Sequence, residues 1–174
     1  AMQKAYPDKN YGYPSAVYRE KGAKDIEEFV GIVFEEAVYE GVKPEVVFAQ
    51  MCNETYFLQF GGDVTAEQCN FAGIGATGEN EPGATFADVR TGIRAQVQHL
   101  KAYASKESLR HDCVDPRFIY VKRGSARYVE WLGIQENPYT VWNTDGTIAS
   151  GCGWATAKNY GFILVSGINK IKSY

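Results

Sequence analysis

The stretch PEVVFAQMCNETYFLQFGG, residues 44–62, decides the fold, because it predicts a helix with a carboxylate on its apolar face. Pro44 fits the first position of a helix, where its missing N–H is no loss, and Glu45 suits the positive end of the helix dipole. The pair Gly61-Gly62 is expected to end this helix. At about 100° per residue, one narrow arc holds Val47, Met51, Glu54 and Leu58.

Glu54 is the unusual member of that arc, because carboxylates are rarely buried without a partner. One explanation is structural: the residue belongs to a buried ion pair, or it escapes to solvent at the helix end. The other is catalytic. Partial burial raises the pKa of a carboxyl group, which then stays protonated near neutral pH and can donate its proton as a general acid. The helical pattern alone does not choose between them.

The residues after this helix favour the catalytic explanation. Residues 70–87 contain several glycines and Pro82, which exclude a long helix and predict a loop with a β-hairpin. A helix end that opens into such a loop is a suitable place for a cleft, because glycines let a polymer approach the backbone closely. Asn70 offers a donor and an acceptor for sugar hydroxyls or an N-acetyl group. The alternative is that Asn70 is a turn residue of this loop.

The rest of the chain predicts a mainly α domain, with a small loop or β-hairpin lobe bordering the cleft. Apolar residues recur at helical spacing over residues 26–37 and again over 89–104. Short helices are expected within 115–135, an irregular loop over 136–153, and a last helix from about Ala155.

The chain has 174 residues, which suits one compact domain. Residues 1–23 are rich in Tyr, Pro, Gly and charge and predict an N-terminal arm or linker, so residues 24–174 are expected to form the catalytic domain. A net charge of −3 argues against nucleic-acid binding. No apolar run approaches the roughly 18 residues of a membrane helix, so no membrane insertion is expected.

The cysteines leave two states open. Their even number permits two disulfides, while reduced cysteines are also frequent in protein cores. They form no Cys-x-x-Cys motif and no Cys/His cluster, so neither a metal site nor another cofactor is expected. The four residues are Cys52, Cys69, Cys113 and Cys152.

Blocks of sequence on both sides of Glu54 carry a family resemblance. The specific ones are residues 41–50, Asn53-Glu54-Thr55, residues 60–64 and residues 70–78; weaker ones are residues 86–103, 114–118, 123–126 and 153–156. Together they resemble the glucosaminidase domain family, glycoside hydrolase family 73. This family comprises the peptidoglycan-cleaving endo-β-N-acetylglucosaminidases of bacterial autolysins and phage lysins. The resemblance spans roughly residues 25–172.

The resemblance implies a lysozyme-like, mainly α fold and hydrolysis of the GlcNAc-β-1,4-MurNAc bond in peptidoglycan. Glu54 stands where the family keeps its catalytic acid, and Asn70 and Phe71 stand where it lines the sugar site. This chain has Asn-Phe-Ala-Gly there, a one-residue difference from the family's Asn-Phe-Gly-type motif. Trp154 holds the place of a family aromatic near the acid, and either it or Tyr160 is expected to contact substrate. A secreted, cell-wall-associated monomer acting on the glycan strand is also expected.

The sequence leaves the second catalytic group open. A glycosidase needs a base about 6.5–9.5 Å from its acid for inversion, or a nucleophile about 5–5.5 Å away for retention. The family's second carboxylate, where one is proposed, comes from a hairpin like the loop after residue 78, so Glu79 is preferred over Glu81. Asp88 is better explained as a helix cap. Alternatively, the substrate's own 2-acetamido group attacks the anomeric carbon, held by Tyr160 or Asn70.

Two other functions stay open. A lytic transglycosylase or muramidase would share the fold and the single glutamic acid but release different products. A non-catalytic glycan-binding or phage-tail structural domain would keep the fold without the chemistry.

Overall fold

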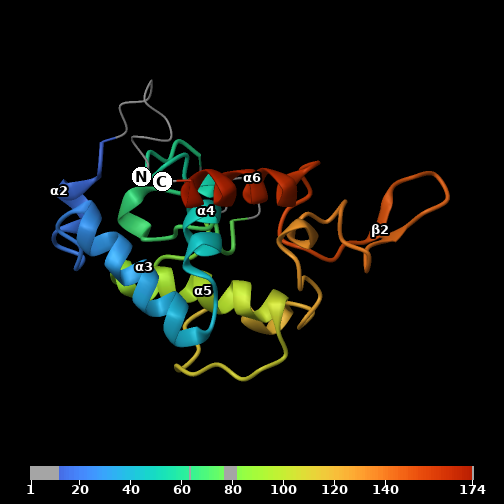
Figure 1. Ribbon diagram of the computed structural model, residues 1–174, viewed down its shortest axis with the longest axis horizontal. Coiled ribbons are helices and arrows are strands. Elements are labelled where there is room, and N and C mark those ends of the chain that lie inside the picture. The colour runs from blue at the N-terminus through green and yellow to red at the C-terminus, as the bar shows by residue number, and fades with distance from the viewer. Residues whose placement is uncertain (1–11, 63, 77–81, 174) are drawn as a thin grey trace.

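A computed structural model describes residues 12–62, 64–76 and 82–173, and this part of the chain is mainly helical (Figure 1). The α-helices are α2 (Ser15–Tyr18), α3 (Ile26–Glu40), α4 (Pro44–Glu54), α5 (Val89–Ala104) and α6 (Tyr160–Lys172). Short 3₁₀ helices are η1 (Ala66–Gln68), η2 (Phe118–Tyr120) and η3 (Val129–Leu132). The strands β1 (Val141–Trp142) and β2 (Ile148–Ser150) pair as an antiparallel hairpin. The predicted fold class, mainly α and lysozyme-like with a small hairpin, is confirmed.

Helices α3 and α5 each begin at a capping aspartate. Asp25 accepts a hydrogen bond from the Glu28 amide at 2.9 Å and caps α3, which ends at Gly41 in the left-handed conformation. Asp88 accepts from the Thr91 amide at 2.7 Å and caps α5, as expected from sequence. The last helix begins at Tyr160, later than the predicted start near Ala155.

Helix α4 ends at Glu54, and the prediction that it runs on to Gly61-Gly62 was wrong. Thr55 ends it, because its hydroxyl donates to the Met51 carbonyl at 2.7 Å and accepts from the Leu58 amide at 2.8 Å. The next three residues, 56–58, have φ values between 48° and 63°. This left-handed turn carries Leu58 back into the core.

The β-hairpin lies at residues 141–150, whereas the sequence placed it within 70–87. Within 70–76 and 82–87 the backbone forms turns without strands. Residues 141–150 suit a hairpin because β-branched and aromatic residues flank a turn that contains Gly146 at φ 83°. The hairpin projects from the body of the molecule (Figure 1), and Trp142 on it is exposed.

The core lies between α3, α4, α5 and α6, with α3 packed on α5 and α4 packed on α6. The described part of the predicted N-terminal arm, residues 12–23, packs onto this core. Tyr18 is fully buried and its ring stacks on Phe29 at 5.9 Å between ring centroids. The Tyr13 hydroxyl donates to the Ala23 carbonyl at 2.7 Å and closes this segment.

A polar seam joins α3 to α5 inside the apolar interface. Glu36 accepts hydrogen bonds from Arg90 and Arg94, each at 2.8 Å. One turn further along α3, Glu40 pairs with Lys101 at 2.9 Å. Both carboxylates are almost completely buried, so these ion pairs fix which residues of the two helices face each other.

The four cysteines are thiols in the structure, three of them buried and Cys113 exposed. Among the described residues, no group of three or more His, Cys, Asp or Glu side chains is arranged to hold a metal ion. Within the same ranges, no helix combines the length and apolar character needed to cross a membrane.

Candidate active site

Glu54 is the last residue of α4, and its carboxyl group meets the first residue of α6. The Tyr160 hydroxyl donates a hydrogen bond to Glu54 Oε1. The side chain of Glu54 is half-buried, and Tyr160 is 4% exposed. Two predicted site residues that stand far apart in sequence are therefore in direct contact.

Burial raises the pKa of the Glu54 carboxyl group, against the smaller lowering effect of hydrogen bonds from Tyr160 and Asn53. Desolvation disfavours the charged form, and the described groups that act on Glu54 bring no positive charge to offset it. A carboxyl group in this state retains its proton to higher pH than an exposed one. That is the property a general acid requires.

Glu54 opens onto a hollow of about 350 Å³, which we call the Glu54 hollow. Its walls are the left-handed turn after α4 and the glycine-rich loop after η1. The described residues that line it are Asn53, Glu54, Thr55, Tyr56, Phe60, Gly61, Gly62, Val64, Asn70, Gly73 and Ala76. These walls are loops, and the β-hairpin supplies none of the described lining residues, in contrast to the predicted hairpin lobe.

Asn70 lies on the wall of this hollow, but its side chain is 1% exposed and holds the loop together. Its Nδ2 donates to the carbonyls of Ile74 at 2.9 Å and Ala84 at 3.0 Å, and its Oδ1 accepts from the Ile74 amide at 2.9 Å. The turn role weighed from sequence is therefore present. The loop's backbone, shaped by Asn70, faces the hollow.

Phe71 is fully buried beneath the same loop. Its ring packs edge-on against Phe29 at 5.1 Å and Tyr18 at 5.7 Å between centroids. The expected contact of this side chain with a sugar does not agree with that burial, because Phe71 has no exposed surface in the structure. Phe71 instead supports the loop from the core side.

Trp154 lies half-buried in a separate aromatic group and is not among the described residues of the Glu54 hollow. Its ring meets His99 edge-on at 4.7 Å and Tyr103 at 6.0 Å between centroids. His99 bonds Asp115 through Nδ1 at 2.6 Å, which makes it part of this packed group.

Of the candidate second carboxylates, Glu79 and Glu81 lie outside the described residues. Asp88 is described, and its carboxylate accepts the Thr91 amide as the N-cap of α5. That bond supports the structural role given to Asp88 from sequence.

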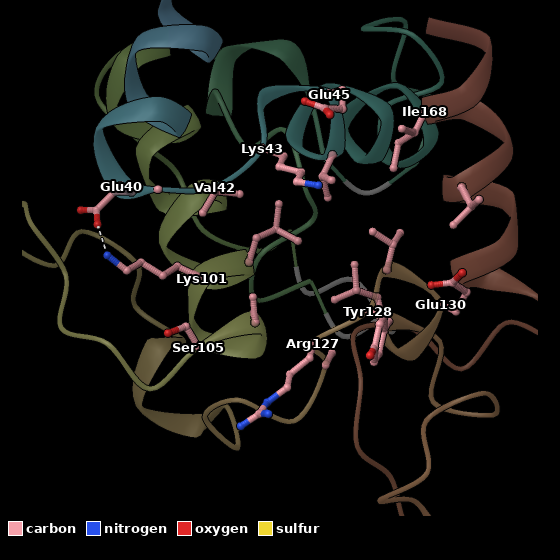
Figure 2. Close-up of a pocket in the computed structure, with 18 of the residues that line it drawn as sticks. Glu40, Val42, Lys43, Glu45, Lys101, Ser105, Arg127, Tyr128, Glu130 and Ile168 are labelled. Atoms are coloured by element: carbon pink, nitrogen blue, oxygen red, sulfur yellow. Dashed lines mark hydrogen bonds and ion pairs between the residues drawn. The ribbon is translucent and has the colours of Figure 1, made fainter. Parts of the chain in front are cut away.

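A larger hollow, of about 460 Å³, lies at the opposite end of α4 (Figure 2). Two of the carboxyl groups that line it, those of Glu40 and Glu45, have pKa values shifted in the wrong direction for a general acid. Burial raises the pKa of Glu40, but hydrogen bonds from the His111 amide, Lys101 and the Arg110 amide outweigh it and lower the pKa overall. The pKa of Glu45 is also lowered, chiefly by its own backbone amide. Carboxyl groups with lowered pKa values are ionised at neutral pH, so the Glu54 hollow is the better active-site candidate.

Two residues of the site were missed from sequence. Gln50 lies one turn before Glu54, and its Nε2 donates to the Tyr160 hydroxyl at 3.2 Å. Gln96 of α5 donates to Gln50 Oε1 at 2.9 Å. Gln96 shares a helix face with Ile93 and Leu100, and a buried amide on an apolar face was the available signal.

Comparison with known proteins identifies a family. The model of the glucosaminidase family, described as mannosyl-glycoprotein endo-beta-N-acetylglucosaminidase, matches residues 31–173. An "uncharacterized protein" of Borreliella burgdorferi is 50% identical over 92 residues, which cover 53% of this chain and 45% of that protein. The match thus spans less than half of the relative's length. No solved structure matches the chain.

The family match covers most of the chain, including the helix that carries Glu54 and the helix that carries Tyr160. The chain therefore belongs to the glucosaminidase family.

Proposed function

We propose that this protein is an endo-β-N-acetylglucosaminidase that hydrolyses the GlcNAc-β-1,4-MurNAc bond of peptidoglycan, with Glu54 as general acid. The observation that carries the proposal is the state of Glu54. Its carboxyl group has a raised pKa, is held by Tyr160, and opens onto a hollow bounded by backbone-rich loops. The family membership supports a glycan that contains N-acetylglucosamine as the substrate.

In the proposed reaction, Glu54 gives its proton to the glycosidic oxygen as the bond from that oxygen to the anomeric carbon of GlcNAc breaks. The leaving sugar departs with a new hydroxyl group. Water then supplies a hydroxyl to the anomeric carbon and a proton to a base, which leaves the GlcNAc with a reducing end. The Tyr160 hydrogen bond stabilises the carboxylate that Glu54 becomes.

Replacement of the acid tests this assignment. Glu54→Gln should lower the rate of cell-wall digestion by roughly 10²–10⁴-fold, because the amide has no acidic proton to transfer. Glu45→Gln, at the other end of the same helix, is the matched control and should stay close to wild type. Both variants would be compared by zymography and by a soluble muropeptide assay. Undiminished clearing by Glu54→Gln would remove Glu54 from the mechanism.

Mass spectrometry of the wild-type digest separates the alternatives. Reducing-end GlcNAc supports the proposal. Reducing-end MurNAc indicates a muramidase, and 1,6-anhydro-MurNAc ends indicate a lytic transglycosylase. Binding to purified wall with no soluble product from either wild type or variant indicates a non-catalytic glycan-binding domain.

For the second catalytic group the proposal remains Glu79, carried over from the family's loop carboxylate. Glu79→Gln should then lose activity while Glu81→Gln keeps it, and NMR of the fresh product should show inversion at the anomeric carbon. If both variants keep activity and the anomeric configuration is retained, the 2-acetamido group of the substrate performs the attack.

Trp154 is proposed to contact the glycan outside the Glu54 hollow, since its ring is half-exposed and held by His99. The site of action is proposed to be the cell wall, reached by secretion, with the protein acting as a monomer and without a cofactor. Cell fractionation and light scattering after size exclusion would test the location and the monomeric state.

A further inference from the structure

A chain of hydrogen bonds crosses three helices and ends on Glu54. Gln96 of α5 donates through Nε2 to Gln50 of α4, Gln50 donates through Nε2 to the hydroxyl of Tyr160, and Tyr160 of α6 donates to Glu54 Oε1. Both glutamines are fully buried and Tyr160 is nearly so. The chain therefore runs through the protein interior, where bulk water does not compete with its bonds.

A backbone carbonyl sets the direction of this chain. Gln96 Nε2 also donates to the Val47 carbonyl oxygen at 3.1 Å. That oxygen can only accept, so the NH₂ group of Gln96 must face it. The second hydrogen of the same NH₂ group then goes to the oxygen of Gln50.

The direction passes on to Tyr160 and Glu54. With its oxygen turned to Gln96, Gln50 presents its NH₂ group to Tyr160, whose oxygen accepts. A hydroxyl has one proton, and in this arrangement that proton is left for Glu54 Oε1.

The orientation of Gln96 comes at a cost. Its Oε1 is buried and has no hydrogen-bond partner among the described residues. A buried unpaired carbonyl oxygen is unfavourable, and such groups in a native protein call for an explanation. Here the two bonds made by Nε2 account for it, because rotating the amide would set two acceptors, Gln96 Oε1 and the Val47 carbonyl, against each other.

We infer that Gln96 and Gln50 are positioning residues that hold Tyr160 as a permanent donor to Glu54 Oε1, so that the catalytic proton resides on Oε2. This rests on the proposed role of Glu54 as the acid. Without the two glutamines the tyrosine hydroxyl could rotate and accept the Glu54 proton, which would hold that proton away from the glycosidic oxygen. The directed bond also stabilises the carboxylate after the proton has left.

The electrostatics agree with this direction. Burial raises the pKa of Glu54, and the bonds from Tyr160 and Asn53 oppose that rise. Burial and the charge of Glu54 raise the pKa of Tyr160, which the bond from Gln50 opposes and the nearby Tyr103 increases. Tyr160 from α6 is the titratable described group that acts on Glu54, with Tyr103 of α5 behind it.

The test replaces each glutamine by methionine, which keeps the length but removes the amide. Gln96→Met and Gln50→Met should each lower kcat by roughly 10-fold or more, leave KM nearly unchanged, and move the basic limb of the kcat profile to higher pH by about 0.5–1 unit. The matched control is Gln98→Met. Gln98 is equally buried on α5 but bonds the Asp112 carbonyl and the Val114 amide, so its loss should leave the pH profile in place. An equal shift in Gln98→Met would mean that the effect is structural and would overturn the inference.

We call the hydrogen-bond chain from Gln96 through Gln50 and Tyr160 to Glu54 the relay. A double-mutant cycle with Tyr160→Phe distinguishes an effect that passes through the relay from an effect of side-chain packing. The single variant Tyr160→Phe removes the last bond, so it should give the largest shift of the Glu54 pKa. Adding Gln96→Met to it should give no further shift, because the effect of Gln96 passes through the hydroxyl. If Gln96→Met shifts the Glu54 pKa in the Tyr160→Phe background as much as it does alone, its effect does not pass through Tyr160, and the relay is contradicted.

Direct titration of Glu54 by ¹³C NMR of its carboxyl carbon, with Glu54→Gln used to assign the signal, keeps this inference separate from the proposed function. A raised Glu54 pKa in Gln96→Met supports the relay, even if Glu54→Gln proves active. An unchanged pKa overturns the relay, even if Glu54→Gln is inactive.

Discussion

At the scale of single residues, burial acts on Glu40 and on Glu54 with opposite outcomes. Glu40 meets Lys101 and the amides of Arg110 and His111, which together hold its charge in the interior. Glu54 meets a neutral hydroxyl and an asparagine. Glu40 is therefore an ionised carboxylate with a structural role. The raised pKa of Glu54 instead favours the form that keeps its proton.

The raised pKa of Glu54 predicts a stability effect of known sign. An unfolded glutamate titrates near its ordinary pKa, so between that value and the raised folded value the native state binds more protons. Native stability consequently falls as pH rises through this window. Glu54→Gln cannot ionise and should escape that loss, so it should be more stable than wild type at pH 7 and similar near pH 4.

Thermal unfolding of wild type and Glu54→Gln at both pH values measures this, with about 1.4 kcal/mol expected for each unit of the pKa shift. Glu20→Gln, at an exposed site, is the control. A variant less stable than wild type at pH 7 would mean that Glu54 is a stabilising anion after all.

Sequence reasoning singled out Glu54 and Tyr160 but not the two glutamines, Gln50 and Gln96, that continue the hydrogen-bond chain beyond Tyr160. Glu54 was visible because its charge contradicts an apolar helix face. Gln50 and Gln96 are neutral, and a glutamine at a single position does not reveal which way its amide is turned. Phe71 shows another limit of sequence reasoning. The family motif gives the position of a side chain but not whether its ring faces the cleft or the core.

At the scale of helices and loops, the contact of α5 with the loop after η1 depends on the absence of a side chain. A Cβ at Gly92 would lie 1.8 Å from the Cys69 carbonyl oxygen. Real Cβ atoms do not approach so closely, so α5 and this loop touch backbone to backbone. Gly92 thereby sets how near α5 lies to the segment that continues into Asn70.

Two glycine substitutions should therefore have opposite effects. Gly92→Ala should destabilise the protein by about 1–3 kcal/mol and lower activity, because the loop wall of the Glu54 hollow must shift. Gly167→Ala in α6 should stabilise by about 0.5–1 kcal/mol, since its Cβ would make an ordinary 3.6 Å contact with Ala49 and alanine favours helix. Urea unfolding measures both; equal effects would contradict the close contact at Gly92.

Local sequence signals at the ends of helices explain which boundaries could be predicted. The start of α5 carries a cap residue, Asp88, that acts over one turn, and its prediction from sequence was correct. The predicted end of α4 was wrong because the helix stops at Thr55, a residue without a strong stop signal, whose hydroxyl bonds back to the Met51 carbonyl. The hairpin was misplaced because glycines mark any turn, and whether strands flank it depends on pairing that local sequence does not show.

At the scale of the whole molecule, the buried pairs between α3 and α5 make the fold sensitive to acid. Burial raises the pKa of Glu36, but hydrogen bonds from Arg94 and Arg90 outweigh it, and the pKa of Glu36 is lowered overall, like that of Glu40. Groups with lowered pKa values stabilise the native state above the unfolded pKa, and this stability is lost as pH falls toward the folded pKa.

Glu40→Gln should accordingly lower stability by about 3–5 kcal/mol at pH 7, because Lys101 is left buried with a neutral partner. The loss should shrink as pH falls below the ordinary glutamate pKa toward the lowered pKa of Glu40, where wild type also loses the charge. Glu28→Gln removes an exposed pair with Lys24 and should change stability far less than Glu40→Gln does. Urea unfolding midpoints measured from pH 7 into the acid range test this prediction. A stability difference between Glu40→Gln and wild type that does not change with pH would exclude the ion pair as the cause.

The relay that ends on Glu54 also sets when the site can first exist. Its members come from α4, α5 and α6, and Tyr160 follows Glu54 by 106 residues. A ribosome makes the acid long before it makes the hydroxyl that holds it. A nascent chain that has not yet released α6 from the exit tunnel thus carries a glutamate without its partner, and the site is completed only after Tyr160 has emerged.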